Sequence, residues 1–403
     1  MNKSCDMTNN WANGDKRLSL FVCAYIASYT LNMCAKTLLP ISGGMWRMVS
    51  LFFGAVIAIA FFNMLPTLLN RIGGRFLITE VLVVFLFFCS YLMGFSEKAV
   101  LTSTFFWTAV ICVPIGSAGM AVKDKTVLFH MMRTLSFYLF PILCIALLSM
   151  RDRGLYSMPV SYALVLPVLF LLTSFDNNGR WISLALALAG TMLIALFGAR
   201  GPLACIAFYI VLKIYMYRKN KKGISRIFLL LFAILAVLAF SKVILSALQI
   251  LLKSRKINSY VLRRIVGGSL LQSTGRMRLW EHYLEMIRQR PLSGYGVMGG
   301  WIDASSGPHN MLLELLLAFG VLLGGTLCCY VIYLFIKAIS NNQGESRDLY
   351  LILASYNVTM YLVAGNCLKS PLFFLFVFLA VGLTRCSETV SKKYEPGGLT
   401  EGV

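Results

Sequence analysis

The sequence predicts an all-α membrane protein with about twelve transmembrane helices and one long loop on the non-cytoplasmic side. Three observations support this prediction. Of the 403 residues, 58% are hydrophobic and only 13% are charged, whereas an average soluble domain has roughly 25% charged residues. Apolar runs long enough to cross a bilayer recur along the whole chain. Lysine and arginine are also concentrated in alternate short loops.

Twelve apolar segments are the expected transmembrane helices. Short turns rich in glycine, asparagine and charged residues separate several of them, and such residues interrupt helices. The expected helices are residues 18–35, 45–69, 76–95, 99–122, 127–149, 157–174, 181–199, 201–217, 226–246, 308–336, 349–367 and 371–387. The chain is therefore expected to divide into transmembrane helices one to nine (1–246), a loop (247–307), helices ten to twelve (308–387) and a tail (388–403).

The basic residues of the short loops orient these helices. With the N-terminus inside, the short cytoplasmic segments contain 18 lysines and arginines, and the short external loops contain 7. This bias predicts that both termini are cytoplasmic and that the long loop is external. The net charge of +21 is then explained by loops that orient helices and contact anionic headgroups. Membrane lipids are expected partners, and nucleic acid is not.

The long loop, residues 247–307, is unusually basic for an external segment, with nine basic residues against three acidic ones. Attraction to lipid headgroups would explain this excess. A site for a phosphate-bearing substrate would also explain it, because the guanidinium group offers phosphate oxygens a planar fork of donors. Both interpretations are compatible with the sequence.

Residues 276–290 of this loop have the periodicity of an amphipathic helix. Apolar side chains recur at i, i+3, i+4 and i+7 from Trp280, and Pro291 is expected to end the helix. Such a helix can lie on the membrane surface with its apolar face down. In that position it would present Arg276 and Arg278 at the depth of lipid phosphates.

Two features follow this amphipathic helix. Residues 293–300 contain four glycines; such a segment is typical of a flexible return loop, and its backbone N–H groups could also approach an anion. His309 stands at the mouth of the tenth expected helix, directly after Pro308, which fits a helix start. A lone histidine is more often structural than catalytic. However, histidine exchanges protons near neutral pH, and we therefore take His309 as the candidate general base.

Five further residues are candidates for substrate binding. Asn310 and Glu314 are spaced i, i+4 and share a face of the tenth helix, and an acid in a membrane helix indicates function by default. Arg200 lies in a tight external turn, where it could snorkel to the interface or contact a phosphate. Arg276 and Arg278 complete the set.

No cofactor or metal is expected from the sequence. The eleven cysteines lie mostly in apolar runs and form no CxxC pair, so neither a metal site nor a disulfide is predicted. The external segments contain no paired-aspartate or DxD motif, and the chain has no glycine-rich nucleotide loop before a helix. A transfer reaction would therefore take its energy from an activated donor.

These motifs together resemble the C-terminal signature of the O-antigen ligase and polymerase superfamily. The resemblance extends over roughly residues 200–324, and the N-terminal half is similar in topology only. Length, helix number and the position of the long loop are similar to those of the lipopolysaccharide O-antigen ligases. The motifs stand at residues 275–280 and 291–296, His309, Asn310, Leu313, Glu314 and Gly320.

The resemblance implies a membrane-embedded glycosyltransferase of GT-C-like architecture on the periplasmic face of a Gram-negative inner membrane. It would be metal-independent and inverting. The donor would be O-antigen on undecaprenyl pyrophosphate, and the acceptor would be a sugar hydroxyl of lipid A–core. By matching motifs, Arg200 and Arg276 would hold the pyrophosphate, and His309 would deprotonate or orient the acceptor.

Three alternatives use the same topology. An O-antigen polymerase would use the same donor to extend glycan; length and loop position favour the ligase. A transporter of lipid-linked sugars should show two related halves, and no internal repeat is visible. A peptidoglycan-polymerising transferase would need an external catalytic aspartate, and the long loop offers only Asp303.

Overall fold

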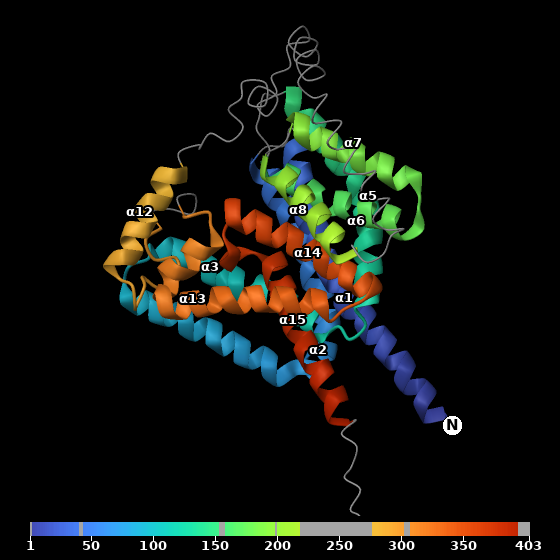
Figure 1. Cartoon of the computed structure of the whole chain (residues 1–403), viewed down its shortest axis with the longest axis horizontal. Coiled ribbons are helices and arrows are strands. Elements are labelled where there is room, and N and C mark those ends of the chain that lie inside the picture. Colours follow the sequence, from blue (N-terminus) through green and yellow to red (C-terminus); the bar gives the residue numbers. More distant parts are fainter. Residues whose placement is uncertain are drawn as a thin grey trace, which may run out of the picture.

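The computed structural model is helical wherever it describes regular elements, and it describes residues 2–39, 43–152, 158–197, 200–217, 276–301 and 307–393 (Figure 1). A π-helical turn (Thr108–Cys112) joins α3 to α4, and a 3₁₀ turn (Cys367–Lys369) precedes α15. The helices are α1 (Asn2–Leu38), α2 (Gly43–Met93), α3 (Lys98–Trp107), α4 (Val113–Ala121), α5 (Lys125–Asp152), α6 (Met158–Asn178), α7 (Trp181–Phe197), α8 (Arg200–Tyr217), α12 (Arg276–Gln289), α13 (Met311–Ser340), α14 (Gly344–Val363) and α15 (Pro371–Lys393).

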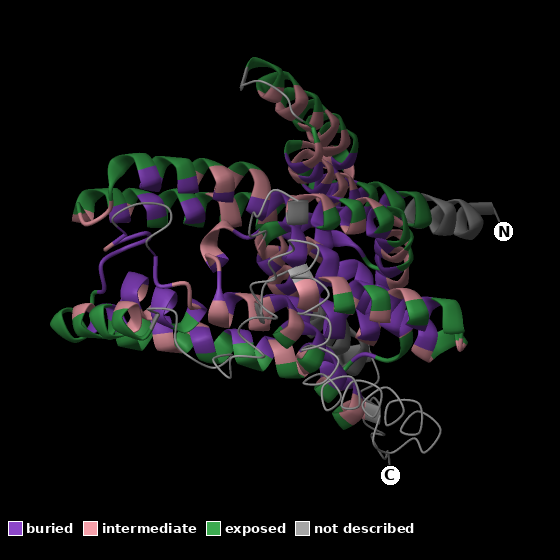
Figure 2. Cartoon of the chain, turned by 90° about the horizontal axis from the view of Figure 1, so that it is seen from above, coloured by how far each residue is buried: buried purple, intermediate pink, exposed green. Residues whose placement is uncertain are grey.

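The chain is a polytopic membrane protein. Among the described residues, six helical segments are long and apolar enough to cross a membrane, and α7, α8 and α15 contain shorter apolar stretches. Large hydrophobic side chains cover the outside of α2, where Leu51 is 72% exposed and Phe62 is 69% exposed. A contiguous apolar surface of this kind is suited to lipid rather than water. Figure 2 shows buried residues in the middle of the bundle and exposed residues along its outer helices.

Helix α2 covers two of the expected helices, 45–69 and 76–95. Its 51 residues would extend about 75 Å if straight, more than twice the hydrocarbon thickness of about 30 Å. The backbone leaves helical geometry at Ile72 (φ −143°, ψ 23°), and the two halves point in different directions in Figure 1. The turn expected between these helices is therefore a bend inside one continuous element.

The other expected helices within the described residues are found. Most of their ends differ by a few residues, but α1 begins at Asn2, well before the expected start at residue 18. The segment 99–122 is divided into α3, the π-helical turn and α4. Three expectations lie outside the described residues: the helix 226–246, the larger part of the long loop and the end of the tail.

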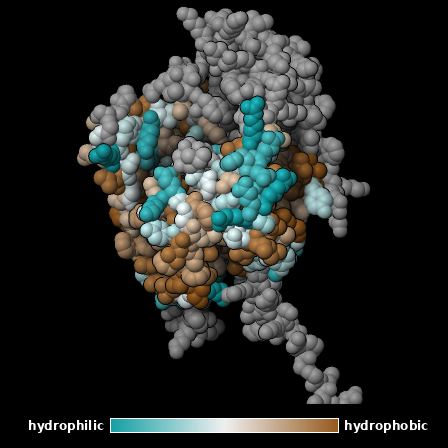
Figure 3. Space-filling model, turned by 90° about the vertical axis from the view of Figure 1, so that its left-hand side faces the viewer, coloured by the Kyte–Doolittle hydropathy of each residue, from teal (hydrophilic) through white to brown (hydrophobic). Residues whose placement is uncertain are grey.

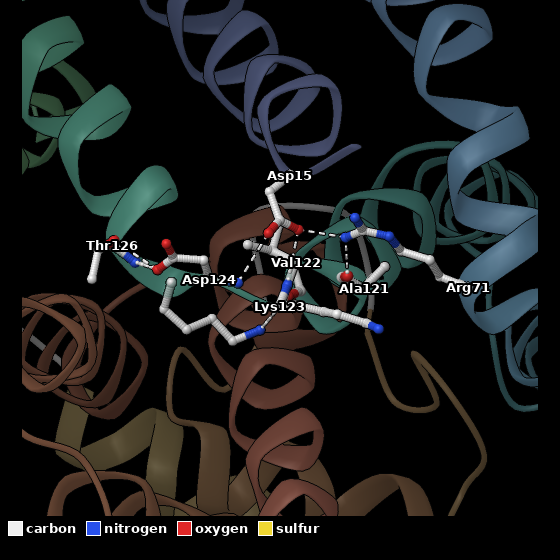
Figure 4. Close-up of polar contacts among 9 residues, drawn as sticks. Asp15, Arg71, Ala121, Val122, Lys123, Asp124 and Thr126 are labelled. Atoms are coloured by element: carbon white, nitrogen blue, oxygen red, sulfur yellow. Dashed lines mark hydrogen bonds and ion pairs between the residues drawn. The ribbon is translucent and has the colours of Figure 1, made fainter. Parts of the chain in front are cut away.

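A buried polar cluster joins α1, α2 and the turn between α4 and α5 (Figure 4). Arg71 donates hydrogen bonds to the Asp15 carboxylate and to the carbonyl of Ala121, the latter at 2.9 Å. Asp15 also accepts from the backbone N–H groups of Lys123 (3.0 Å) and Asp124 (3.1 Å). The pairing offsets the cost of burying both charges, at the end of the bundle that the charge pattern assigns to the cytoplasm.

A second buried cluster joins α6, α8 and α14. The Nζ atom of Lys213 lies 2.9 Å from an oxygen of Asp176 and 2.7 Å from an oxygen of Asp348. Asn177 donates a hydrogen bond to the other Asp348 oxygen at 3.0 Å. The three helices are thereby fixed to one another by charge as well as by apolar packing.

Candidate functional site

Helix α13 is broken at Gly320, where φ is 72° and ψ is 177°. A break in a membrane helix leaves backbone carbonyls without their intrahelical partners, and these need donors from elsewhere. The N–H of Tyr295 donates to the carbonyl of Leu317 at 2.8 Å, and the N–H of Gly296 donates to the carbonyl of Ala318 at 2.9 Å. The segment before α13 therefore completes the hydrogen bonding of the broken helix.

This segment, residues 293–300, is called the glycine loop below. It is buried from Gly294 to Gly299. It is also bound to α2, where Ser90 Oγ accepts from the N–H of Val297, and to the turn after α2, where Ser96 Oγ donates to the Val297 carbonyl, both at 2.8 Å. The expectation of a flexible return loop was wrong. Several of its N–H groups are directed at protein acceptors because the break in α13 exposes carbonyls beside it.

Two glycines make the close approach of the glycine loop to α13 possible. A Cβ atom at Gly294 would lie 2.6 Å from the Ala318 carbonyl oxygen, and one at Gly320 would lie 2.3 Å from the Leu292 carbonyl oxygen. Both residues also have positive φ, 62° and 72°, which side chains disfavour. The contact between the two backbones therefore depends on glycine at each position.

Helix α12 packs on α13 beside the glycine loop. Tyr283 and Ile287 are buried in one cluster with apolar residues of α13, so that part of the expected apolar face is confirmed. Leu284, expected on the same face, is 44% exposed. Trp280 Nε1 donates to the Pro308 carbonyl at 3.0 Å, and this bond fixes α12 to the residue immediately before His309.

The two arginine candidates of α12 lie in its first turn. Arg276 is the first residue of the helix and precedes Trp280 by four residues, so both positions are on one face. The side chain of Arg276 lies outside the described part of the chain. Arg278 is exposed. On the face that carries α12, Figure 3 shows hydrophilic side chains grouped above a hydrophobic region.

His309 has a left-handed backbone, with φ of 48°, a conformation that costs a non-glycine residue of order 1–3 kcal/mol. Its ring centroid lies 6.4 Å from that of Trp301, in an edge-to-face arrangement. His309 is partly exposed, whereas Pro308 before it is buried. The imidazole is therefore accessible, and the backbone that carries it is held in place on both sides.

Asn310 caps α13. Its Oδ1 atom accepts from the N–H groups of Leu312 (3.0 Å) and Leu313 (3.3 Å), as an N-cap residue does. Its Nδ2 atom donates to the Leu362 carbonyl at the end of α14 (3.2 Å). These bonds fix the start of α13 and the direction of the residue before it. Contact of Asn310 with substrate stays a prediction.

Glu314 lies one turn further along α13 and is only 4% exposed. Its Oε2 atom accepts from the N–H of Cys367 at 3.0 Å and from the Cys367 Sγ at 3.2 Å. Its Oε1 atom has no hydrogen-bond partner among the described residues. Glu314 thus binds the connection between α14 and α15 (residues 364–370) to α13; its predicted contact with substrate is not tested.

A cavity of about 410 Å³ lies on the other side of this connection, among α1, α3, α5, α6 and α14. Most of its wall is apolar or aromatic, and Asn366 and Lys369 contribute polar groups to it. Five tyrosines line it: Tyr25, Tyr29, Tyr162, Tyr356 and Tyr361. Sequence reasoning counted Lys369 only as a loop charge and missed the cavity, because its wall comes from helices far apart in the chain.

Arg200 is the first residue of α8, and its side chain lies outside the described part of the chain. The next residue, Gly201, is so close to α6 that a Cβ atom there would lie 1.9 Å from the Tyr162 hydroxyl oxygen. Because Tyr162 lines the cavity, the backbone at Arg200 stands at the cavity wall. His309, Arg276 and Arg278 lie on the α12–α13 side of the molecule.

The connection between α14 and α15 contacts both the cavity and the glycine loop beside His309. Residues 364–370 contribute Asn366 and Lys369 to the cavity, and Asn366 Nδ2 also lies 3.2 Å from the sulfur of Met298 in the glycine loop. Glu314 is bonded to Cys367 of the same segment, and Asn310 is bonded to Leu362 at the end of α14 just before it. The cavity and the start of α13 therefore lie against residues 362–370.

Part of the chain is similar to a known protein family. Residues 182–328 match the family model described as O-antigen ligase. The matched region begins in α7, ends in α13 and includes all six predicted site residues. Neither the curated proteins nor the solved structures gave a match.

Proposed function

We propose that this chain, which carries an O-antigen ligase family domain over residues 182–328, joins O-antigen polysaccharide to lipid A–core. The family consists of enzymes of lipopolysaccharide-related sugar transfer in the bacterial envelope. The proposed donor is O-antigen on undecaprenyl pyrophosphate, and the acceptor is a sugar hydroxyl of lipid A–core. The reaction is placed on the periplasmic face of a Gram-negative inner membrane, with both termini cytoplasmic.

The strained turn at His309 is the observation that carries this proposal. A left-handed backbone at a non-glycine residue persists only where surrounding contacts hold it, and such strain is concentrated at functional sites. Here Trp280 holds the Pro308 carbonyl, and the Asn310 side chain holds the start of α13. An imidazole on such a turn loses little entropy when it meets a substrate hydroxyl.

The proposed reaction is a displacement at the anomeric carbon of the donor. The acceptor hydroxyl oxygen forms the new bond to this carbon from the side opposite the leaving group, so the configuration is inverted. His309 orients the hydroxyl and takes its proton. The bond from the anomeric carbon to the phosphate oxygen breaks, and undecaprenyl pyrophosphate leaves with the electron pair.

Arg276 and Arg200 are assigned to the pyrophosphate, whose negative charge increases as the bond breaks. The support is positional: Arg276 is one helical turn from Trp280, which is bonded to Pro308, and Arg200 starts α8 at the cavity wall. We expect Arg276→Ala to reduce kcat/KM strongly. Arg276→Lys should recover little of this loss, because an ammonium group lacks the planar fork. Initial rates at varied donor concentration measure both.

Reconstitution of transfer tests the proposed function. Purified protein in detergent is given O-antigen undecaprenyl pyrophosphate and lipid A–core, with EDTA and without ATP, and the products are separated by electrophoresis. We expect lipid A–core carrying O-antigen to form in the presence of EDTA, because the external segments of the sequence contain no paired-aspartate or DxD motif that would bind a metal ion. Absence of product, with both substrates shown to bind, would contradict the proposal.

An O-antigen polymerase is the second candidate, since the family match is compatible with both activities. A deletion strain distinguishes the two. Loss of a ligase leaves lipopolysaccharide with no O-antigen, whereas loss of a polymerase leaves a single repeat on the core. A transporter of lipid-linked sugars would give no covalent product in the reconstituted reaction.

The division of the chain is part of the proposal. Residues 247–307 are assigned to the periplasm and residues 388–403 to the cytoplasm, in agreement with the loop charges. Single cysteines introduced in these two segments should react with a membrane-impermeant maleimide from opposite sides of the membrane. Labelling of both from the periplasm would contradict the topology.

A further inference from the structure

Lys369 is a half-buried cation at the cavity to which the proposed reaction assigns no role. Among the described residues that line the cavity of about 410 Å³, Lys369 is the one cation, and none is acidic. It is half-buried and lies between α14 and α15, outside the membrane-spanning helices, and burial lowers the pKa of its ammonium group. The described residues contain no carboxylate within 4.0 Å of this ammonium. An anion from outside the protein would compensate the charge.

The backbone at Lys369 is held from two directions. Its carbonyl accepts from Trp107 Nε1 at 2.9 Å, and its N–H donates to Asn366 Oδ1 at 3.2 Å. Thr108 donates to the neighbouring Leu368 carbonyl at 3.0 Å. Thr108 begins the π-helical turn, a feature that is often found at functional sites. None of these bonds involves the Lys369 side chain. The protein therefore fixes the backbone from which this side chain extends and leaves its ammonium group available.

The rest of the cavity is suited to an apolar chain. Aromatic and aliphatic side chains form most of its wall, and its volume is in the range of about 300–1,000 Å³ that small ligands occupy. Tyr29, on α1, is half exposed, so the cavity is open to the surface of the bundle. A ligand that fits this arrangement has a flexible hydrocarbon part, which enters the cavity, and an anionic group, which stays beside Lys369.

We propose that the cavity holds the first isoprene units of a polyprenyl pyrophosphate and that Lys369 binds a phosphate of this lipid. The inference rests on the proposed function, which supplies such a lipid as donor. It adds a binding residue and a direction: the lipid lies among α1, α5 and α6, and the sugar end lies across residues 364–370, toward His309. The contacts of this connection with Met298 and Glu314 put the two parts within reach of one substrate.

An anionic phospholipid headgroup has the same chemistry as the proposed ligand at Lys369. The cavity favours the polyprenyl lipid because a single branched chain can follow an aromatic wall, whereas a phospholipid has two chains to place in about 410 Å³. The two sources are separated by direct competition in the test.

Binding to the full-length protein in detergent tests the inference. Dissociation constants are measured for undecaprenyl pyrophosphate, undecaprenol and phosphatidylglycerol, with wild type, Lys369→Met, Lys369→Arg and Lys98→Met. Lys98 is an exposed external lysine that does not line the cavity. Thermal unfolding of each variant shows whether it is folded.

Lys369→Met should weaken binding of undecaprenyl pyrophosphate about tenfold or more, as expected for loss of a charge-assisted bond. Binding of undecaprenol should not change, and Lys369→Arg and Lys98→Met should stay close to wild type. An unchanged affinity of folded Lys369→Met would overturn the inference. The inference would also be overturned if phosphatidylglycerol competed equally with undecaprenyl pyrophosphate and if its binding depended on Lys369 to the same extent.

This experiment can fail separately from the proposed function. If the protein transfers O-antigen but Lys369 has no effect on lipid binding, the cavity assignment is wrong and the ligase proposal stands. If undecaprenyl pyrophosphate binds with the expected dependence on Lys369 but no lipid A–core is glycosylated, the cavity assignment stands and the ligase proposal does not.

Discussion

The buried charges of the Asp15 and Lys213 clusters are paired with opposite charges within the protein, whereas Glu314 and Lys369, on either side of the connection between α14 and α15, have no such partner among the described residues. Asp15 accepts from Arg71 and from two backbone N–H groups, and Lys213 lies between Asp176 and Asp348. At the other end, Glu314 has one oxygen without a hydrogen-bond partner among the described residues, and Lys369 faces a cavity whose described lining residues include no acid.

The backbone differs between the two regions in the same way. Around the Lys213 cluster the helices α6 and α14 keep helical geometry. Beside the Asp15 cluster, α2 bends at Ile72, but no non-glycine residue there has a positive φ among the described residues. Near the cavity and His309 the structure has left-handed residues at Met298 and His309, a helix broken at Gly320 and a π-helical turn at residues 108–112. The charges that hold helices together are compensated inside the protein. Strained backbone and uncompensated charge are found instead in the region that we propose binds the donor. The predictions below test this distinction.

Replacing His309 should have the largest effect on activity. A positioned general base contributes about 10²–10⁴-fold to the rate, so His309→Ala should lower kcat by a factor in this range while the donor still binds. His309→Asn is the matched control for the backbone, because asparagine tolerates the left-handed conformation and cannot act as the base. Near-normal kcat in either variant would show that another group accepts the proton.

The Lys213 cluster should affect stability and not catalysis. Lys213→Met leaves the buried Asp348 carboxylate and the partly buried Asp176 carboxylate without their cation and should cost about 3–5 kcal/mol of unfolding free energy. Adding Asp348→Asn should restore part of this loss, since it removes one of the two charges. Unfolding in detergent measures the first effect, and kcat of the folded fraction measures the second. A fall in kcat with unchanged stability would contradict the division of roles.

The sequence predicts helices well here because length and hydropathy decide them. The segments that became α5, α6, α7 and α13 are each apolar over about the thickness of a bilayer, and a membrane leaves a backbone few alternatives to a helix. The candidates at 309, 310 and 314 were also recognisable, since a histidine, an asparagine and an acid stand within six residues at the start of an apolar segment.

What could not be predicted depends on contacts between distant residues. Gly320 lies in a run that is apolar on both sides, so nothing in its neighbours indicates that the helix breaks there and binds the glycine loop. Lys369 is 60 residues after His309 in the chain, and its place at the cavity depends on packing against Trp107. Local patterns identify reactive side chains, but they do not show which of them share a cavity.

Gly320→Ala tests whether the break in α13 is needed. The added Cβ would meet the Leu292 carbonyl oxygen and occupy positive φ, so we expect a loss of about 1–3 kcal/mol in unfolding free energy together with reduced activity. Gly325→Ala is the matched control: it lies in the same helix with nothing within 4 Å of an added Cβ. That variant should be unchanged or slightly more stable, because alanine favours helix. If Gly320→Ala and Gly325→Ala had equal effects on stability and activity, the break in α13 would not have the role proposed for it.

Glu314→Gln should have the smallest effect and separates a positioning role from a direct one. Glutamine keeps an oxygen that can accept from the Cys367 N–H, so kcat should stay within about threefold of wild type if Glu314 serves to hold residues 364–370. Glu314→Ala removes this acceptor and leaves the buried N–H without a partner, at a cost of about 1–3 kcal/mol. If Gln and Ala reduce kcat equally while unfolding of the Gln variant is unchanged, the carboxylate itself meets the substrate, as the sequence alone suggested.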